Sequence, residues 1–365
     1  MSAPRTVEDL FTPAAVVDVT RMAANLDNMA GYVAQHRLSL WPHTKTHKTP
    51  ELAREQLRRG ASGLTVATLH EAEVMSRATR DLLLAYPPVG YPKLDRLVAL
   101  AEQTNLTIAV DSREALSGVQ AALRRSGARI NVLVEIDAGM HRVGVASPAG
   151  AVAIANQVAD SNHTDYAGVL FYPGHIREHV NEQKYVIAAT RALINEFVTA
   201  LVDAGLAPSR ISGGSTPTAF ASHQFEAVNE IRPGTYIFND RTTAAIGACA
   251  WQDCAYSVLA TVVSTSVAGQ AVVDAGSKAV FKEALRGPDW PGFGALLDRP
   301  EVIVKSMSEE HGLLDLGKTE WRPHVGDRVR IVPNHVCVSV NLHERLWLLQ
   351  NDEIVASYDI AARGW

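Results

Sequence analysis

This chain of 365 residues has few cysteines, only a small excess of negative over positive charge, and no long uninterrupted apolar run. Three cysteines, an odd and small number, do not suit a disulfide framework, so we expect a reducing compartment and a cytoplasmic protein. A formal net charge of -5 argues against nucleic acid as a partner, because such proteins carry basic surfaces. The first residues, MSAPRTVEDLFTP, lack the basic and apolar segments of a secretory signal.

The most apolar region is also not a membrane span. Its sequence, CAYSVLATVVSTSVAGQAVVDAG, is interrupted by Ser, Thr and Gly and is rich in Val. This composition is typical of successive strands. We therefore expect no membrane partner.

Short apolar runs alternate with helical stretches through the first two thirds of the sequence. The runs are LSLWP, GLTVA, LLLAY, LTIAV, INVLVEI, YAGVLFY, RISGG and EIRPGTYIF. A repeated strand, helix, strand order implies parallel pairing, because parallel strands need a crossover between them. The pattern predicts an α/β fold with a (β/α)8 TIM-type barrel over residues 15–245, the alternative being an open doubly wound sheet.

The pattern changes near residue 246, where Val-rich alternating segments with Gly turns replace the strand and helix rhythm. Examples are SVLATVVSTSVAG, QAVVDAG and EIVASYDIAARGW. This favours a mostly β second domain over residues 246–365, to which residues 1–14 contribute.

Polar residues gather after the ends of the predicted barrel strands, where active groups of such barrels lie. PHTKTHK follows the first strand, DAGMHRVG the fifth and YPGH the sixth. SGGSTPT and RPGTY follow the last two, where phosphate is often held. Gly213 and Gly214 can bring backbone N–H groups close to an anion, and Ser215 and Thr216 add hydroxyls. The alternative is a pair of ordinary glycine turns.

A lysine after the first strand fits this phosphate site, because pyridoxal phosphate is bound through a lysine amine. Lys45 is that candidate, and the alternative is a solvated surface charge. The amine must be neutral to react, and nearby cations lower its pKa. His43, His47 and Lys48 are the expected cations.

Together PHTKTHK, DAGMHRVGV, YPGH, GGSTPT, RPGTYIFND and PNHVC resemble the D-serine dehydratase and D-threonine aldolase family, which has the alanine-racemase-like fold of pyridoxal phosphate enzymes. The resemblance covers nearly the whole chain. It implies that Lys45 is the Schiff-base residue and that Arg142 contacts the phenolic oxygen of the cofactor. It also implies that the ring and phosphate are lined by Tyr172, Gly214, Ser215, Thr216, Gly234, Thr235 and Tyr236.

The segment VPNHVCVSVNL alternates polar and apolar residues, which predicts a strand with His335 and Cys337 on one face. Imidazole and thiolate together favour zinc, and two protein ligands leave coordination positions open. The alternative is a packed strand with a core cysteine. The resemblance implies a metal pair, since D-serine dehydratases carry His-X-Cys as a zinc site. The aldolases usually have an aspartate there, which suits Mn²⁺ or Mg²⁺.

The resemblance implies a lyase acting on small β-hydroxy-D-amino acids. We expect dehydration and deamination to a 2-oxo acid and ammonia, with Lys45 taking the α-proton. The alternative is aldol cleavage to glycine and an aldehyde, with His175 as the base on the β-hydroxyl. A racemase is disfavoured because the segment QAVVDAGSKAV has no tyrosine, and a non-catalytic cofactor carrier because carriers lack a β domain. The resemblance also implies a homodimer.

Overall fold

A computed structural model describes residues 4–285 and 291–365 of the chain. It contains two compact units. The barrel unit comprises Asn28–Gly234 and Ala362–Trp365, and the β unit comprises the residues up to Asp27 together with Thr235–Ala361. The helix α1, Val19–His36, begins in the β unit and ends in the barrel unit.

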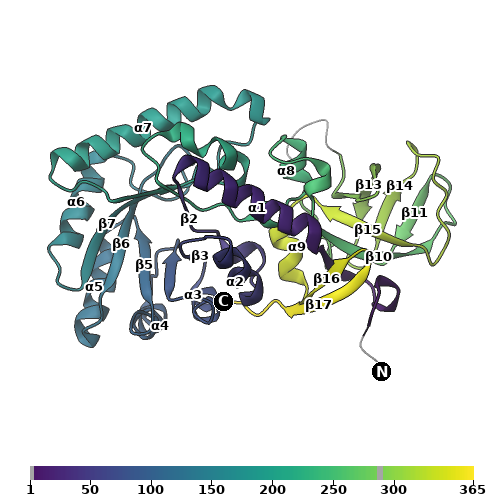
Figure 1. Cartoon of the computed structure of the whole chain (residues 1–365), viewed down its shortest axis with the longest axis horizontal. Helices are drawn as coiled ribbons and strands as arrows, with labels where there is room; N and C mark the ends of the chain where they lie inside the picture. The colour runs from purple at the N-terminus through teal and green to yellow at the C-terminus, as the bar shows by residue number, and fades with distance from the viewer. Residues whose placement is uncertain (1–3, 286–290) are drawn as a thin grey trace. The chain divides into compact units, whose positions relative to one another are not determined.

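The barrel unit contains a parallel sheet of eight strands (Figure 1). Every apolar run that the sequence singles out overlaps one of them. In spatial order they are β2 (Ser39–Leu40), β9 (Glu230–Ile231), β8 (Arg210–Gly213), β7 (Thr164–Leu170), β6 (Ile130–Glu135), β5 (Asn105–Val110), β4 (Asp81–Leu84) and β3 (Leu64–Val66). A parallel bridge between His43 and Thr65 joins the two ends of this order. The predicted (β/α)8 fold class is confirmed.

Helices connect the strands, and local sequence explains where they begin. They are α2 (Pro50–Arg58), α3 (Leu69–Met75), α4 (Tyr91–Ala101), α5 (Arg113–Ser126), α6 (Pro148–Ala159) and α7 (Lys184–Asp203). Ser112 and Ser147 cap α5 and α6 by accepting hydrogen bonds from backbone N–H groups. Thr49 lies at the N-cap of α2, but its hydroxyl donates to the carbonyl of His47 instead of capping the helix.

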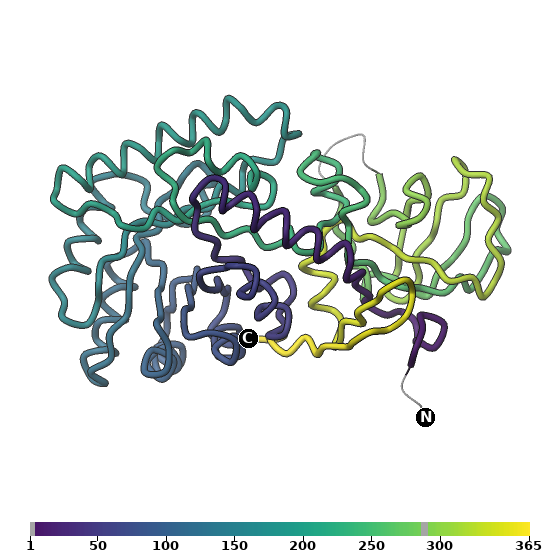
Figure 2. Tube along the Cα trace, viewed as in Figure 1, coloured from purple at the N-terminus to yellow at the C-terminus, as the bar shows by residue number. Residues whose placement is uncertain are grey.

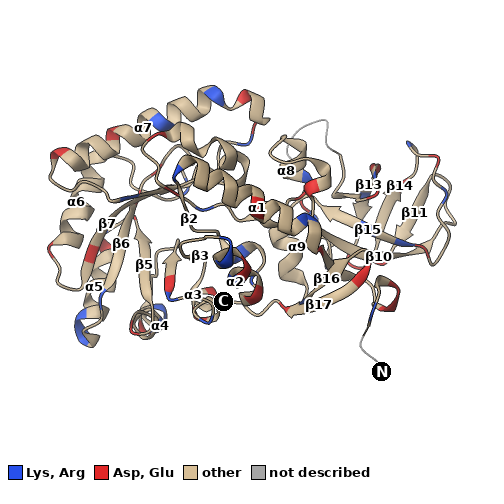
Figure 3. Ribbon diagram, viewed as in Figure 1, with Lys and Arg blue, Asp and Glu red and all other residues tan. Residues whose placement is uncertain are grey.

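The helix α7 is, within the described residues, long and apolar enough to cross a membrane by length and composition. Its buried side chains recur at helical spacing, as expected for a helix that packs one face on a barrel. They are Ile187, Thr190, Ile194, Phe197 and Leu201. Charges of both signs mark the rest of α7 (Figure 3), so we assign it to the barrel wall.

The β unit contains a nine-stranded sheet. In spatial order its strands are β11 (Gln270–Val273), β14 (Gly312–Asp315), β13 (Arg299–Met307), β12 (Gly294–Leu296), β15 (Arg328–Pro333), β10 (Tyr256–Ser264), β1 (Ala14–Asp18), β16 (Arg345–Gln350) and β17 (Glu353–Asp359). β11 also pairs with β10, which closes the first six strands into a small barrel. The predicted mostly β character is confirmed.

The units divide at Asp27 and Gly234, whereas the sequence predicts a barrel over residues 15–245. On the N-terminal side the difference comes from β1, which pairs antiparallel with β10 and parallel with β16. In Figure 2 the purple start of the chain accordingly lies beside the yellow strand β16. On the other side, the short helix α8 (Arg241–Ala245) belongs to the β unit.

The predicted strand through His335 and Cys337 is wrong. β15 ends at Pro333, and Val336–Leu342 forms the helix α9 with His335 at its N-cap. The Asp240 carboxylate accepts a hydrogen bond from the N–H of Val336, 3.1 Å away, and so caps the helix. Val336 and Val340, one helical turn apart, are both fully buried. Packing and a distant cap therefore outweigh the preference of valine for strands.

Candidate functional site

Lys45 lies where the first barrel strand ends. It is the central residue of the 3-10 turn η2, Thr44–Thr46, which follows β2 closely. The buried Thr44 hydroxyl donates to the carbonyl of Thr65 at 3.1 Å, tying the turn to β3. The Lys45 ammonium lies 5.9 Å from the ring centroid of Tyr172. The structure thus brings together two of the predicted cofactor residues.

The three cations expected around Lys45 are not free charges. Burial and the charge of Lys45 hold the pKa of His43 well below its usual value. Burial lowers the pKa of His47 to about 4, so both imidazoles are neutral near pH 7. Lys48 forms an ion pair with Glu71 at 3.0 Å. The predicted positive charge is wrong for His43 and His47, because their burial cannot be seen in the sequence, whereas Lys48 is a cation paired with Glu71.

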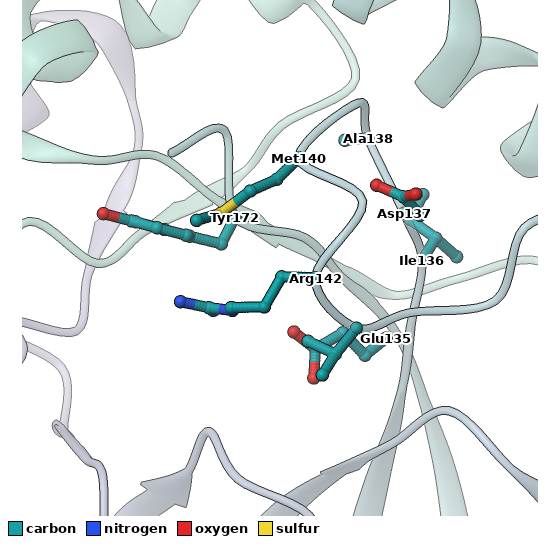
Figure 4. A pocket seen from close by; sticks show the side chains of 8 residues that line it. Glu135, Ile136, Asp137, Ala138, Met140, Arg142 and Tyr172 are labelled. Atoms are coloured by element: carbon teal, nitrogen blue, oxygen red, sulfur yellow. The ribbon is translucent and has the colours of Figure 1, made fainter. Parts of the chain in front are cut away.

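Tyr172 and Arg142 lie together beside a pocket at the end of β6 (Figure 4). Their side chains extend in the same direction, and the Arg142 guanidinium carbon is 5.2 Å from the Tyr172 ring centroid. Gly174 makes room for this ring, since a Cβ there would lie 2.2 Å from a Tyr172 ring carbon. The pocket is also lined by Glu135, Ile136, Asp137, Ala138, Met140 and Val143.

Two buried ionisable residues, Glu135 in the pocket wall and Arg232, were not among the predicted site residues. Arg232 donates to the Ser212 hydroxyl at 2.8 Å and to the carbonyl of Phe171 at 2.6 Å. Burial raises the pKa of Glu135 to about 7, against the opposing charge of Arg232. Both are charged residues inside apolar strand runs, VLVEI and EIRPG, and that signal could have identified them.

The SGGST segment forms a cup suited to an anion. Gly214 has φ of +89°, a conformation that favours glycine. Ser215 is the N-cap of the 3-10 helix η4, Thr216–Phe225. Pro217 has no N–H and the Thr218 N–H donates to the Ser215 carbonyl at 3.2 Å, so the backbone donors of this turn are those of Ser215 and Thr216. The Thr216 hydroxyl is buried and has no hydrogen-bond partner in the described part of the chain. A phosphate oxygen would supply the missing partner, so these residues fit the cofactor.

Gly234 ends the barrel unit close to the lysine turn. A Cβ on Gly234 would lie 2.8 Å from the Thr46 hydroxyl and 2.9 Å from the carbonyl of His43. Only glycine therefore fits this position without a shift of the turn. The next two predicted cofactor residues, Thr235 and Tyr236, begin the 3-10 turn η5, Thr235–Ile237, of the β unit.

His175 follows β7 and packs against the loop after β6. A Cβ on Gly139 would lie 3.2 Å from its ring. Its Nε2 is 3.4 Å from the Thr190 hydroxyl, and its Nδ1 is buried without a partner among the described residues. Burial lowers the pKa of His175, which favours the neutral imidazole that a general base requires.

In the β unit, His335 and Cys337 lie close together although the segment is a helix. The negative charge of Cys337 is the main cause that raises the pKa of His335 to about 11, and Asp240 adds to it. The Thr235 hydroxyl is 3.7 Å from the Cys337 sulfur. No group of three or more His, Cys, Asp or Glu side chains suited to a metal occurs in the ranges that the structure covers. A soft imidazole and thiolate pair still fits a zinc ion with open coordination positions.

Asp240 supports this pair and was given no role in the sequence analysis. It is 1% exposed, and its Oδ2 is 3.3 Å from Nδ1 of His335. Its Oδ1 accepts hydrogen bonds from the backbone N–H and hydroxyl of Thr243. A carboxylate behind a histidine ligand orients the ring and raises its basicity. Asp240 is 95 residues from His335 in sequence, so no local pattern connects them.

Cys249 and Cys254 form a hydrogen-bonded pair with each other. The pKa of Cys254 is raised by a hydrogen bond with Cys249 and by burial, so its thiol stays protonated. This arrangement agrees with a packing role for both residues.

Family models, curated relatives and a solved structure together match nearly the whole chain. The model of the alanine racemase N-terminal domain matches residues 17–242, and that of a putative serine dehydratase domain matches residues 255–349. A D-threonine aldolase of Arthrobacter sp. is 31% identical over 97% of this chain and 93% of its own length. A D-threo-3-hydroxyaspartate dehydratase of Delftia sp. (strain HT23) is 34% identical over 92% of this chain and 93% of its own length. The crystal structure of D-threonine aldolase from Filomicrobium marinum matches with a TM-score of 0.91 at 31% identity, covering 100% of this chain and 99% of that one.

Proposed function

We propose a specific reaction for this chain, which belongs to the family of D-serine dehydratases and D-threonine aldolases with the alanine-racemase-like fold. It is an enzyme, and we infer that it is a lyase dependent on pyridoxal phosphate and a divalent metal. Its substrate is a small β-hydroxy-D-amino acid, of the D-serine, D-threonine or 3-hydroxy-D-aspartate type. The products are a 2-oxo acid and ammonia.

The cofactor proposal is supported by the cup and the lysine turn of the barrel unit. Gly214, Ser215, Thr216 and Gly234 would hold the phosphate, and the unpartnered Thr216 hydroxyl is the observation that carries this assignment. Tyr172 and Arg142 would contact the ring, and Thr235 and Tyr236 would complete its surroundings. Lys45 would hold pyridoxal phosphate, which supplies an electron-withdrawing ring to the α-carbon of an amino acid joined to it.

Two side chains of the barrel unit are proposed to move protons. The free Lys45 amine would take the α-proton of the substrate. His175, neutral because of its burial, is the candidate base for the β-hydroxyl in the aldolase alternative. In the elimination it would instead orient the ring or Tyr172.

The metal proposal is supported by the His335 and Cys337 pair. Thiolate and imidazole favour Zn²⁺ over Mn²⁺ or Mg²⁺, and Asp240 would orient the His335 ring. His335 and Cys337 would hold the zinc ion, which would supply Lewis-acid assistance to departure of the β-hydroxyl. This donor pair is the single observation that favours elimination over aldol cleavage.

Aldol cleavage to glycine and an aldehyde remains the second candidate, because a relative named D-threonine aldolase is 31% identical over nearly the whole chain. A racemase is less favoured because Gln270–Val273 and the following residues offer no tyrosine. A cofactor carrier is less favoured because the chain has a folded β unit. The homodimer implied by the resemblance and the cytoplasmic location predicted from the sparse cysteines are part of the proposal.

The test is product analysis with D-threonine and zinc-supplemented enzyme. We expect 2-oxobutanoate and ammonia in equal amounts. Glycine and acetaldehyde would overturn elimination and leave a lyase of the second kind. D-Threonine converted only to its α-epimer, L-allo-threonine, would overturn both.

A further inference from the structure

Lys48 closes the turn that carries Lys45. Its backbone N–H donates to the carbonyl of Thr44 at 2.7 Å, so the two residues enclose Lys45. Lys48 has φ of +54°, a left-handed conformation that is uncommon outside glycine. Such a conformation persists only where surrounding contacts hold it.

The side chain of Lys48 is held by a buried carboxylate. Its ammonium lies 3.0 Å from Oε1 of Glu71, and the two side chains are 12% and 2% exposed. The other Glu71 oxygen accepts from the N–H of Ala67 at 2.6 Å. The Glu71 N–H in turn donates to the Thr68 hydroxyl at the N-cap of α3. Lys48 is thereby tied to the start of α3, and its charge is balanced by Glu71.

The last residues of the chain bind the same lysine. The N–H of Ala362 donates to the carbonyl of Lys48 at 3.0 Å, and the Lys48 ammonium donates to the carbonyl of Ala362 at 3.3 Å. Ala362 is fully buried, whereas Trp365 is 93% exposed. In Figure 2 the yellow end of the chain lies beside the blue segment that contains α2 and α3. The contact is thus made by the backbone of Ala362 and not by the terminal side chain.

We propose that Lys48 is a positioning residue for Lys45, and that Ala362 and Glu71 form a clamp that holds it. This inference rests on the proposed role of Lys45 as the cofactor lysine. Each hydrogen-bonding group of Lys48 is used: its N–H by Thr44, its carbonyl by Ala362, and its ammonium by Glu71 and Ala362. Lys48 therefore acts on Lys45 through the shape of the turn. A reacting amine displaced by a fraction of an ångström loses much of its effectiveness.

The test compares two truncations of the full-length enzyme. Ending the chain at Ala361 removes both clamp bonds to Ala362 and leaves Lys48 and Glu71 in place. Ending it at Arg363 removes Gly364 and Trp365 but keeps Ala362, and so is the matched control. We measure the dissociation constant for pyridoxal phosphate, the pH at which its yellow absorbance titrates, and amide exchange of residues 43–49.

For the chain ending at Ala361 we expect faster exchange in this turn, a shifted absorbance titration and cofactor binding weakened about tenfold. The chain ending at Arg363 should behave as the parent. Lys48→Met should reproduce the first result, and Lys48→Arg, which keeps the donors, should recover part of it. Parent-like exchange and absorbance titration in the chain ending at Ala361 would overturn the clamp.

Failure of the proposed function gives a different result. If Lys45→Ala keeps the yellow absorbance, Lys45 is not the cofactor lysine, and the link from the clamp to the cofactor is overturned with it. Faster turn exchange in the chain ending at Ala361 would then still support a clamp on the turn alone. If Lys48→Met does not fold, the two truncations decide, since neither changes a buried charge.

Discussion

The proposed cofactor residues of the barrel unit and the proposed metal pair of the β unit have opposite electrostatic character. The cofactor residues are hydrogen-bond donors: the Lys45 ammonium, the Arg142 guanidinium and the Thr216 hydroxyl, which has no partner among the described residues. The metal pair gathers negative charge, from Cys337 and Asp240 around His335. One arrangement suits an anion and the other a cation. The residues of each unit thus fit one of the two groups that the proposed reaction needs.

Replacing Lys45 should have the largest effect on activity and should abolish cofactor attachment without changing metal binding. In Lys45→Ala we expect no yellow absorbance and a fall in turnover of more than about 10,000-fold, because both covalent attachment and the proton-transferring amine are lost. The zinc content should stay at the parent level. The measurement is absorbance together with metal analysis, and a coupled loss of zinc would contradict the separation of the two sites.

Replacing Cys337 should do the reverse. Cys337→Ala should keep the yellow absorbance, lose zinc and lower turnover by about 1000-fold, equivalent to several kcal/mol of lost Lewis-acid assistance. Cys249→Ala is the matched control and should keep both zinc and turnover. Turnover retained in metal-free Cys337→Ala would refute the zinc role.

Glu135 is an acidic residue in the pocket that Arg142 and Tyr172 line, and it predicts a pH dependence of stability. Its pKa rises from the ordinary 4.5 to about 7 in the folded protein, so the folded state binds more protons between these values. Stability of the cofactor-free protein should therefore fall by about 3 kcal/mol as pH rises through this window. Glu135→Gln should remove that fall. Urea unfolding at pH 5 and pH 8 measures the free energy of unfolding at each pH. An equal change between the two pH values in parent and variant would contradict the assignment.

Replacing Thr216 should give the smallest effect, a weaker binding of the cofactor through its phosphate. Thr216→Val removes one hydroxyl expected to bind a charged phosphate, which should weaken cofactor binding by about 2 kcal/mol, roughly 30-fold. The control is Thr199→Val on the exposed side of α7, which should bind as the parent does. Binding is measured by titrating the cofactor-free protein, and an unchanged constant in Thr216→Val would place the phosphate elsewhere.

Local patterns in the sequence determined the barrel and the location of its polar loops. The eight strands were predictable because a strand and helix rhythm and parallel pairing follow from short-range periodicity. Lys45, Arg142 and Tyr172 follow strand ends, and parallel strands present those ends at one edge. Their proximity in the structure is therefore a consequence of topology.

Only the tertiary structure decided the charge states around Lys45 and the helical conformation of the segment that carries His335 and Cys337. Lys48 is neutralised by Glu71, 23 residues away, and the imidazoles of His43 and His47 are neutral because they are buried. The alternating segment after Pro333 is a helix because Asp240 caps it and its valines pack inside the β unit. Burial and partners from distant segments set both protonation and local conformation, and neither is encoded in the neighbouring residues.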